Sequence, residues 1–253
     1  MIQLKNSAQI SAMKEAGRIT GEALLIAREH VREGVSTYEL DKLIREHIER
    51  SGARPSFLGY AGFPASACIS INDEVIHGIP SNKRILQEGD LVKIDVGAFY
   101  KGYHGDSART IPVGRVSDEA ARLIEVTRRS FFAGVEQMKI GNRLGDVGSA
   151  IQECVEKAGF SVVRRYIGHG IGKELHEQPD VPNYGTAGRG TRLCAGMVLA
   201  IEPMVNVGTE KVLEMPDGWT VKTEDASLSA HYENTVALTS EGVVITTLID
   251  KDF

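Results

Sequence analysis

The sequence predicts an α+β fold, because two pairs of helical segments are each followed by a group of strand-like segments. The chain has 253 residues and contains no low-complexity tract or long polar linker that would separate two domains. No residue-level repeat is visible, so only the order of the elements repeats. We therefore expect one domain spanning residues 1–253, with two similarly built halves around one curved sheet.

The first pair of helices has clear start and stop signals. Asn6 and Ser7 are good N-cap residues, and apolar residues at helical spacing follow them up to Gly34, a plausible stop. The second helix begins with a capping-box pattern, STYE at 36–39, and should close near Gly52.

The strands of the first half end in a hairpin. Strand-like runs are predicted at 67–71 and 74–76, and residues 91–111 read LVKIDVGAFYKGYHGDSARTI. A turn at Lys101-Gly102 would place Asp95 diagonal to Asp106 across the two strands. Two buried carboxylates in one hairpin repel each other, and a bound cation would relieve that cost. The alternative is that one Asp faces water while the other caps a turn.

The second half repeats this order. Ser117 and Asp118 can cap a third helix, and a fourth is predicted at 144–157, with Gly159 after it. Strand-like runs follow at 161–167, 197–207, 220–224, 232–239 and 243–247.

Composition excludes several classes of protein. Hydrophobic residues make up 42% of the chain, charged residues 25%, and the formal net charge is −5. This balance is ordinary for a globular protein and gives no basic surplus for nucleic-acid binding. No run approaches the ~20 apolar residues of a membrane span. The cysteines form no CxxC pair, which favours reduced thiols. We expect a cytoplasmic protein that binds neither nucleic acid by itself nor a membrane.

Three more metal-competent side chains stand in apolar, glycine-rich or strand-like settings: His169, Glu202 and Glu233. With the two hairpin aspartates, they give the chain a resemblance to the methionine aminopeptidase family of the short bacterial type, type I, from about residue 10 to residue 247. The motifs that carry it are INDEVIHGIP, IDVGAFYKGYHGD, GHGIGKELHE, LAIEPM and WTVKTEDASLSAHYENTV. The resemblance implies a pita-bread fold with two pseudo-symmetric halves around a mainly antiparallel sheet. It also implies removal of the initiator methionine from nascent chains whose second residue is small.

The resemblance implies a metal centre made from all five residues. Four carboxylates carry four negative charges, which two divalent cations would neutralise. By the family pattern Asp106 and Glu233 bridge the two metals, Asp95 completes one metal, and His169 with Glu202 completes the other. Oxygen ligands with one imidazole favour Mn, Fe(II) or Co, with Zn still possible. Glu202 could also act as a general base.

The family pattern places two further histidines beside the substrate. His176 would donate to the scissile carbonyl oxygen, and His77 would contact the peptide nitrogen near the cut. Taken alone, each is a loop histidine for which a solvated side chain is the simpler interpretation. The histidines at 30, 47, 104 and 231 are interpreted as structural or surface residues.

An apolar slot for the methionine side chain is implied by Tyr60, Phe63, Cys68 and Trp219, with His77 at its edge. For Trp219, core packing is the alternative. The chain departs from many relatives at Phe57 and Leu175, which leaves the shape of the slot open. Asn72 and Ser229 match members of a monovalent-cation site of some relatives, although polar turn residues are the simpler reading.

Two other functions remain as alternatives. One is cleavage of Xaa-Pro bonds, as in prolidase-like relatives, and the other is a non-catalytic pita-bread binding protein, a class that usually loses metal ligands. We expect a monomer whose partners are nascent polypeptide N-termini, at the ribosome.

Overall fold

The computed structural model describes residues 1–248 and contains the four predicted α-helices: α1 (Ser7–His30), α2 (Thr37–Arg50), α3 (Asp118–Val135) and α4 (Leu144–Lys157). Asn6 and Ser36 form capping boxes at the starts of α1 and α2, and Ser117 caps α3, as predicted. Helix α1 ends before Gly34, however. The chain leaves the helix early because the amide of Gly34 donates to the carbonyl of Leu86.

The strands form four small groups, and every pairing between them is antiparallel. The first contains β1 (Arg54–Pro55), β2 (Ala67–Ile71), β4 (Leu91–Tyr100) and β5 (Tyr103–Pro112). The largest contains β7 (Gly168–Gly170), β8 (Glu177–Val181), β9 (Val198–Ile201), β14 (Asn234–Thr239) and β15 (Gly242–Ile245).

Two three-stranded groups complete the sheet. One joins β6 (Ser161–Val162), β10 (Met204–Asn206) and β13 (Ser229–His231), and the other joins β3 (Glu74–Ile76), β11 (Val212–Glu214) and β12 (Val221–Thr223). The halves meet where the backbones of Ala108 and Glu233 exchange two hydrogen bonds, of 3.0 and 3.3 Å. These bonds connect the first-half hairpin directly to the chain between β13 and β14.

Several predicted strands are shorter than expected. The run at 197–207 is broken at Glu202-Pro203, since proline has no backbone N–H to donate to a ladder. The run at 161–167 keeps only Ser161–Val162, and the run at 232–239 begins at Asn234. Strands β1, β7, β8, β11 and β13 were not predicted, because each is short or polar on one side.

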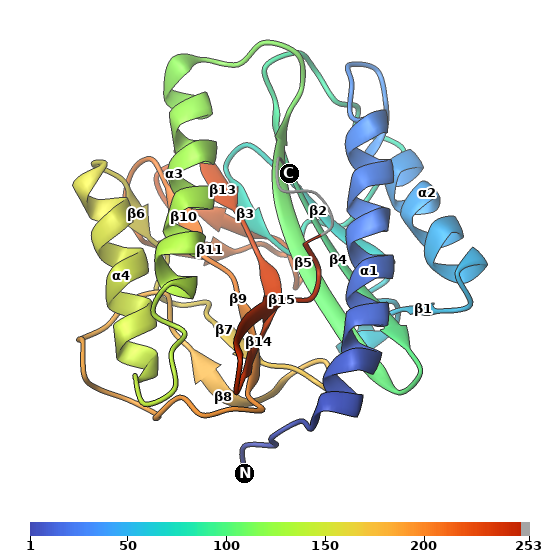
Figure 1. Ribbon diagram of the computed structural model, residues 1–253. Helices are drawn as coiled ribbons and strands as arrows, with labels where there is room; N and C mark the ends of the chain where they lie inside the picture. The colour runs from blue at the N-terminus through green and yellow to red at the C-terminus, as the bar shows by residue number, and fades with distance from the viewer. Residues whose placement is uncertain (249–253) are drawn as a thin grey trace.

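The two helix pairs lie on opposite sides of the strands in Figure 1, with α1 against the β4–β5 hairpin, α2 against β1 and β2, and α3 and α4 against the second half. Helix α1 approaches the hairpin closely: a Cβ on Gly105 would lie 2.8 Å from the Cα of Gly17. Buried apolar clusters fill both interfaces, with Ile19 and Ile94 in the first and Leu123 and Val205 in the second. The repeated helix pairs confirm the prediction of two similarly built halves.

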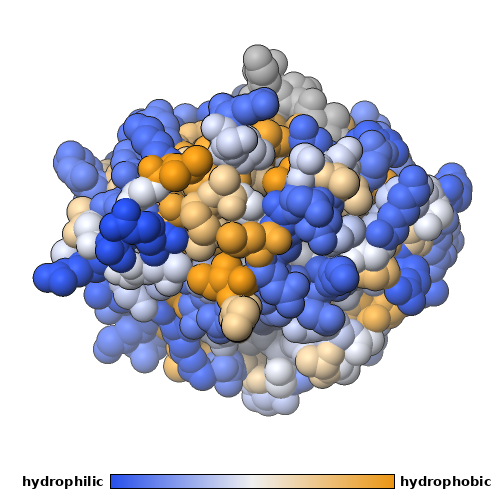
Figure 2. All heavy atoms as spheres, turned by 60° about the horizontal axis from the view of Figure 1, so that its bottom comes forward, coloured by the Kyte–Doolittle hydropathy of each residue, from blue (hydrophilic) through white to orange (hydrophobic). Residues whose placement is uncertain are grey.

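The face drawn in Figure 2 is mostly hydrophilic. Figure 2 shows apolar side chains gathered near the middle of the face that forms the bottom of Figure 1. Within residues 1–248, no helix combines the length and the hydropathy that a bilayer crossing requires.

Candidate metal centre and substrate pocket

The β4–β5 hairpin brings Asp95 and Asp106 together as its register predicts. Asp95 pairs with Ala108 and Asp106 with Gly97, so the two aspartates are diagonal neighbours. Asp106 is 4% exposed, and its backbone bonds to the Thr235 hydroxyl in both directions, at 2.9 and 3.0 Å. The hairpin therefore fixes both carboxylates on rigid backbone against the second half of the chain.

The second half supplies the other three predicted ligands. His169 lies on β7, Glu202 at the break between β9 and β10, and Glu233 between β13 and β14. The Nε2 atom of His169 is 3.6 Å from Glu202 Oε1 and 3.9 Å from Asp106 Oδ2. Side-chain atoms of Asp106, His169 and Glu233 all lie within 4.8 Å of one another. The structure thus brings together side chains that are up to 138 positions apart in the chain, from Asp95 to Glu233.

Burial makes the negative charge of this cluster costly. It raises the pKa of Asp106 to about 7, and burial together with neighbouring carboxylates raises the pKa values of Asp95, Glu202 and Glu233 well above their usual range. Asp95 Oδ1, Asp106 Oδ1 and Glu233 Oε1 are buried without a hydrogen-bond donor within residues 1–248. Oxygen atoms in this condition are suited to bind a cation, so these residues fit a metal centre.

The imidazole of His169 is also suited to bind a metal ion. Burial lowers its pKa to about 3, so the ring is neutral. Its Nδ1 lies 2.8 Å from the carbonyl oxygen of Gly170, which can only accept, so the hydrogen is on Nδ1. The lone pair is therefore on Nε2, the atom that faces Asp106 and Glu202. A neutral imidazole with its other nitrogen bonded to a backbone carbonyl is typical of a metal ligand.

A cavity of about 200 Å³ opens onto this cluster. All of the residues predicted for the metal centre and the substrate pocket line it: Asp95, Asp106, His169, Glu202, Glu233, His77, His176, Tyr60, Phe63, Cys68 and Trp219. The two departures from the family pattern, Phe57 and Leu175, also line it.

The apolar end of the cavity has aromatic walls. The rings of Phe63 and Trp219 meet edge to face, with centroids 5.0 Å apart. Cys68 pairs with Asp95 across β2 and β4, and burial raises the pKa of its thiol, so it contributes an uncharged surface. Leu175 is 2% exposed. The result is a narrow apolar slot that ends beside the carboxylate cluster.

Two histidines also line the cavity. The ring of His176 is 4.1 Å from that of His169, centroid to centroid, and its Nδ1 is 2.6 Å from the hydroxyl of Tyr60. His77 follows β3 with a left-handed φ of 59° and sets its ring at a steep angle to Trp219. Burial lowers the pKa of His77 to about 4 and also lowers that of His176. Both imidazoles are therefore neutral near pH 7.

His231 is a neighbour of the cluster that the sequence analysis missed. It is 1% exposed, and its Nε2 is 3.9 Å from both Glu202 Oε2 and Glu233 Oε2. It stands two positions before Glu233, and the two-residue period of a strand would have placed both on one face. It was expected to be a structural or surface residue, and its burial against two carboxylates was not anticipated.

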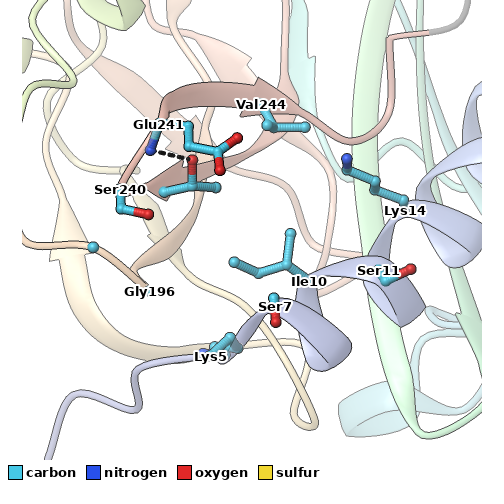
Figure 3. A pocket seen from close by; sticks show the side chains of 11 residues that line it. Lys5, Ser7, Ile10, Ser11, Lys14, Gly196, Ser240, Glu241 and Val244 are labelled. Atoms are coloured by element: carbon cyan, nitrogen blue, oxygen red, sulfur yellow. Dashed lines mark hydrogen bonds between the residues drawn. The ribbon is translucent and has the colours of Figure 1, made fainter.

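A second cavity, of about 370 Å³, lies between the start of α1 and the β14–β15 turn. Figure 3 shows Ile10 of α1 and Val244 of β15 on its sides, with Glu241 at the turn. Glu241 is its one acidic residue, and neither histidine nor cysteine lines it. A cavity of this composition has no set of metal ligands, so the chemistry is assigned to the smaller cavity.

Known proteins share both the sequence and the fold. The model of metallopeptidase family M24 matches residues 11–240. The methionine aminopeptidase of Clostridium acetobutylicum is 56% identical over 250 residues, which cover 99% of this chain and all of that protein. The methionine aminopeptidase of Escherichia coli is 44% identical and covers 99% of this chain and 96% of its own.

Solved structures of related proteins have the same fold as this chain. The methionine aminopeptidase of Thermotoga maritima superimposes with a TM-score of 0.97 at 43% identity, covering 98% of this chain and all of that one. The prolidase of Pyrococcus furiosus gives 0.76 at 26% identity, and the match covers 66% of its chain. These likenesses confirm the predicted pita-bread fold. The chain belongs to the metallopeptidase family M24 and, within it, to the methionine aminopeptidases.

Proposed function

We propose that this chain is a dinuclear metal aminopeptidase that removes the N-terminal, initiator methionine from nascent proteins when the second residue is small. One observation carries the proposal: a single cavity joins a narrow apolar slot to a buried cluster of four carboxylates and one imidazole. The slot can hold a side chain while the cluster acts on the adjacent peptide bond.

The charges of the cluster favour two divalent ions. Asp95, Asp106, Glu233, His169 and Glu202 would hold them, with Asp106 and Glu233 shared between the two ions by the family resemblance. Two such ions, of Mn, Fe(II), Co or Zn, would supply a polarised carbonyl and a water of lowered pKa. The raised pKa values of the four carboxylates support this assignment, because a cation stabilises their charged forms.

The side chains around the ions have separate roles in the proposed reaction. Glu202 takes a proton from the attacking water as general base. The Tyr60 hydroxyl and Nδ1 of His176 are hydrogen-bonded, and in the tautomer that we propose the hydroxyl donates and the hydrogen of the neutral ring is on Nε2. That N–H is then a donor for the carbonyl oxygen as negative charge develops on it. His77 contacts the nitrogen of the peptide bond that is cut.

Selectivity for the first residue comes from the slot. Phe63, Cys68 and Trp219 offer apolar and polarisable surface to an unbranched thioether. Charged side chains would be desolvated there without a partner and should be rejected strongly. Leucine should be rejected by only ~10–200-fold, since a difference of about one methylene discriminates no better.

The second residue of the substrate must pass His77 and the rim of the slot, so small residues should be preferred there. We further propose that the enzyme works as a monomer in the cytoplasm, at the ribosome. It would use neither nucleic acid nor a membrane as a partner.

Four peptides test the proposal, each offered at one concentration with Mn or Co. Met-Ala-Ser should be cut quickly, Met-Lys-Ser hardly at all, and acetyl-Met-Ala-Ser should stay intact, because the free α-amino group is proposed to bind at the metals. Comparable cleavage of the acetylated peptide would contradict this mode of binding. Turnover of an Ala-Pro peptide in place of Met-Ala-Ser would favour the Xaa-Pro alternative, and no turnover of any peptide by metal-loaded protein would favour a binding protein.

A further inference from the structure

A buried lysine lies outside the cavity that holds the metal cluster. Lys93 of β4 is 1% exposed and is one of the largest fully buried side chains of the protein. Its Nζ donates to the main-chain carbonyl oxygens of Asn72, at 2.7 Å, and of Leu91, at 3.4 Å. A buried ammonium is costly, so its position needs an explanation.

The carbonyl of Asn72 is the centre of a junction between three segments. It also accepts a hydrogen bond from the amide of Ser229, at 3.0 Å. The Asn72 side chain accepts from the amide of Leu91, at 2.9 Å, and donates to Asp90, at 2.8 Å. The ammonium of Lys93 therefore lies where the β2–β3 turn, the start of β4 and the start of β13 meet.

Each of these segments leads to the proposed active site. Strand β4 continues from Lys93 to Asp95, β3 leads to His77, and β13 is followed by Glu233. A change in the spacing at the junction would move residues from both halves of the chain. The junction can thus position the metal ligands without touching the substrate.

Main-chain carbonyl oxygens of this kind are also what a sodium or potassium ion binds. We propose that Lys93 is a tethered monovalent cation, whose ammonium replaces a free ion among the carbonyls near Asn72 and Ser229. The chain then holds its junction together without depending on sodium or potassium. Lys93 is a positioning residue in this account, and the account rests on the proposed function only where turnover is measured.

Two variants of the metal-loaded protein test this, all measured at the same pH. Lys93→Ala opens space for an ion, whereas Lys93→Met fills the space with a chain of similar length and no charge. Each is compared with the unchanged protein in potassium chloride, sodium chloride and tetramethylammonium chloride at equal ionic strength. The readouts are the thermal midpoint and kcat/KM on Met-Ala-Ser.

The unchanged protein should give the same values in all three salts. Lys93→Ala should lose about 5 °C in its thermal midpoint in tetramethylammonium, as for a lost hydrogen bond from a charged donor, and regain it saturably with potassium or sodium. Lys93→Met should show the loss without the recovery. If Lys93→Ala does not fold in tetramethylammonium, its refolding yield in potassium gives the same comparison.

Two results would overturn the proposal. One is a saturable response of the unchanged protein to potassium or sodium, which would show that the junction still binds a free ion. The other is a Lys93→Ala protein that responds identically to all three salts. The thermal midpoint needs no substrate, so a failure here is distinguishable from a failure of the proposed aminopeptidase activity.

Discussion

Among single residues, Asp106 carries the largest share of the proposed metal chemistry. Asp106→Asn keeps the shape of the side chain but removes one charge and one strong oxygen ligand. We expect loss of most peptide turnover and of at least one equivalent of metal, measured by elemental analysis beside an assay on Met-Ala-Ser. Full metal content with near-normal turnover would rule out a bridging role.

His176 is expected to act on the substrate and not on the metals. His176→Ala should keep its metal and slow turnover by roughly 10²–10³-fold, the usual effect of losing one donor to a developing oxyanion. Loss of metal would instead make His176 a ligand.

Tyr60→Phe is the matched variant, because it removes the hydroxyl that orients His176 while leaving an aromatic wall in the slot. We expect a fall in kcat smaller than that of His176→Ala, with KM little changed. An unchanged kcat would show that the hydrogen bond at 2.6 Å does not orient the imidazole.

The residues whose surroundings could be predicted from the sequence have neighbours that are close in the chain, and the others do not. Asp95 and Asp106 were predictable as neighbours because both lie in one hairpin, whose turn fixes the register. His231 and Lys93 were not, because their importance comes from burial against segments that are distant in the chain. Only the fold shows which polar side chains in strands are removed from water.

At the level of elements, the helices were more predictable than the strands. Asn6, Ser36 and Ser117 cap their helices through local hydrogen bonds, and such bonds depend on sequence alone. The short strands depend on partners elsewhere, so β8 and β11 gave no clear pattern. The strand breaks at Glu202-Pro203 because proline has no backbone N–H, a local cause. The break was not predicted, because the residues on both sides of it form one apolar run.

The contact between α1 and the hairpin gives a prediction about packing. Gly105→Ala would place a methyl group 2.8 Å from the backbone of Gly17, and backbone cannot move aside as a side chain can. We expect a loss of about 1–3 kcal/mol in the free energy of unfolding, as for an overpacked core. Denaturant unfolding of the metal-loaded protein measures it, and an unchanged midpoint would mean that α1 shifts without cost.

For the whole molecule, the pKa values of the cluster predict how stability depends on pH. The folded-state pKa of Asp106 is raised to about 7, above its value in the unfolded chain, so protonation favours the folded state. Metal-free protein should therefore lose stability as the pH rises from about 4 to 7. Bound metal should remove most of this loss, because it stabilises the charged carboxylates.

Thermal unfolding at pH 5 and at pH 7, with and without a chelator, measures the effect. The gain in thermal midpoint from metal should be larger at pH 7 than at pH 5. An equal gain at both values would show that the carboxylates are not protonated in the metal-free protein.

The hydrogen bonds between Ala108 and Glu233 have a consequence for how the enzyme is made. The first two proposed ligands are synthesised early, and the fifth, Glu233, follows Asp95 by 138 positions. A growing chain cannot complete the metal cluster until Glu233 has left the ribosome. A chain interrupted between Asp106 and Glu233 would therefore carry the two aspartates without the other ligands of the proposed centre.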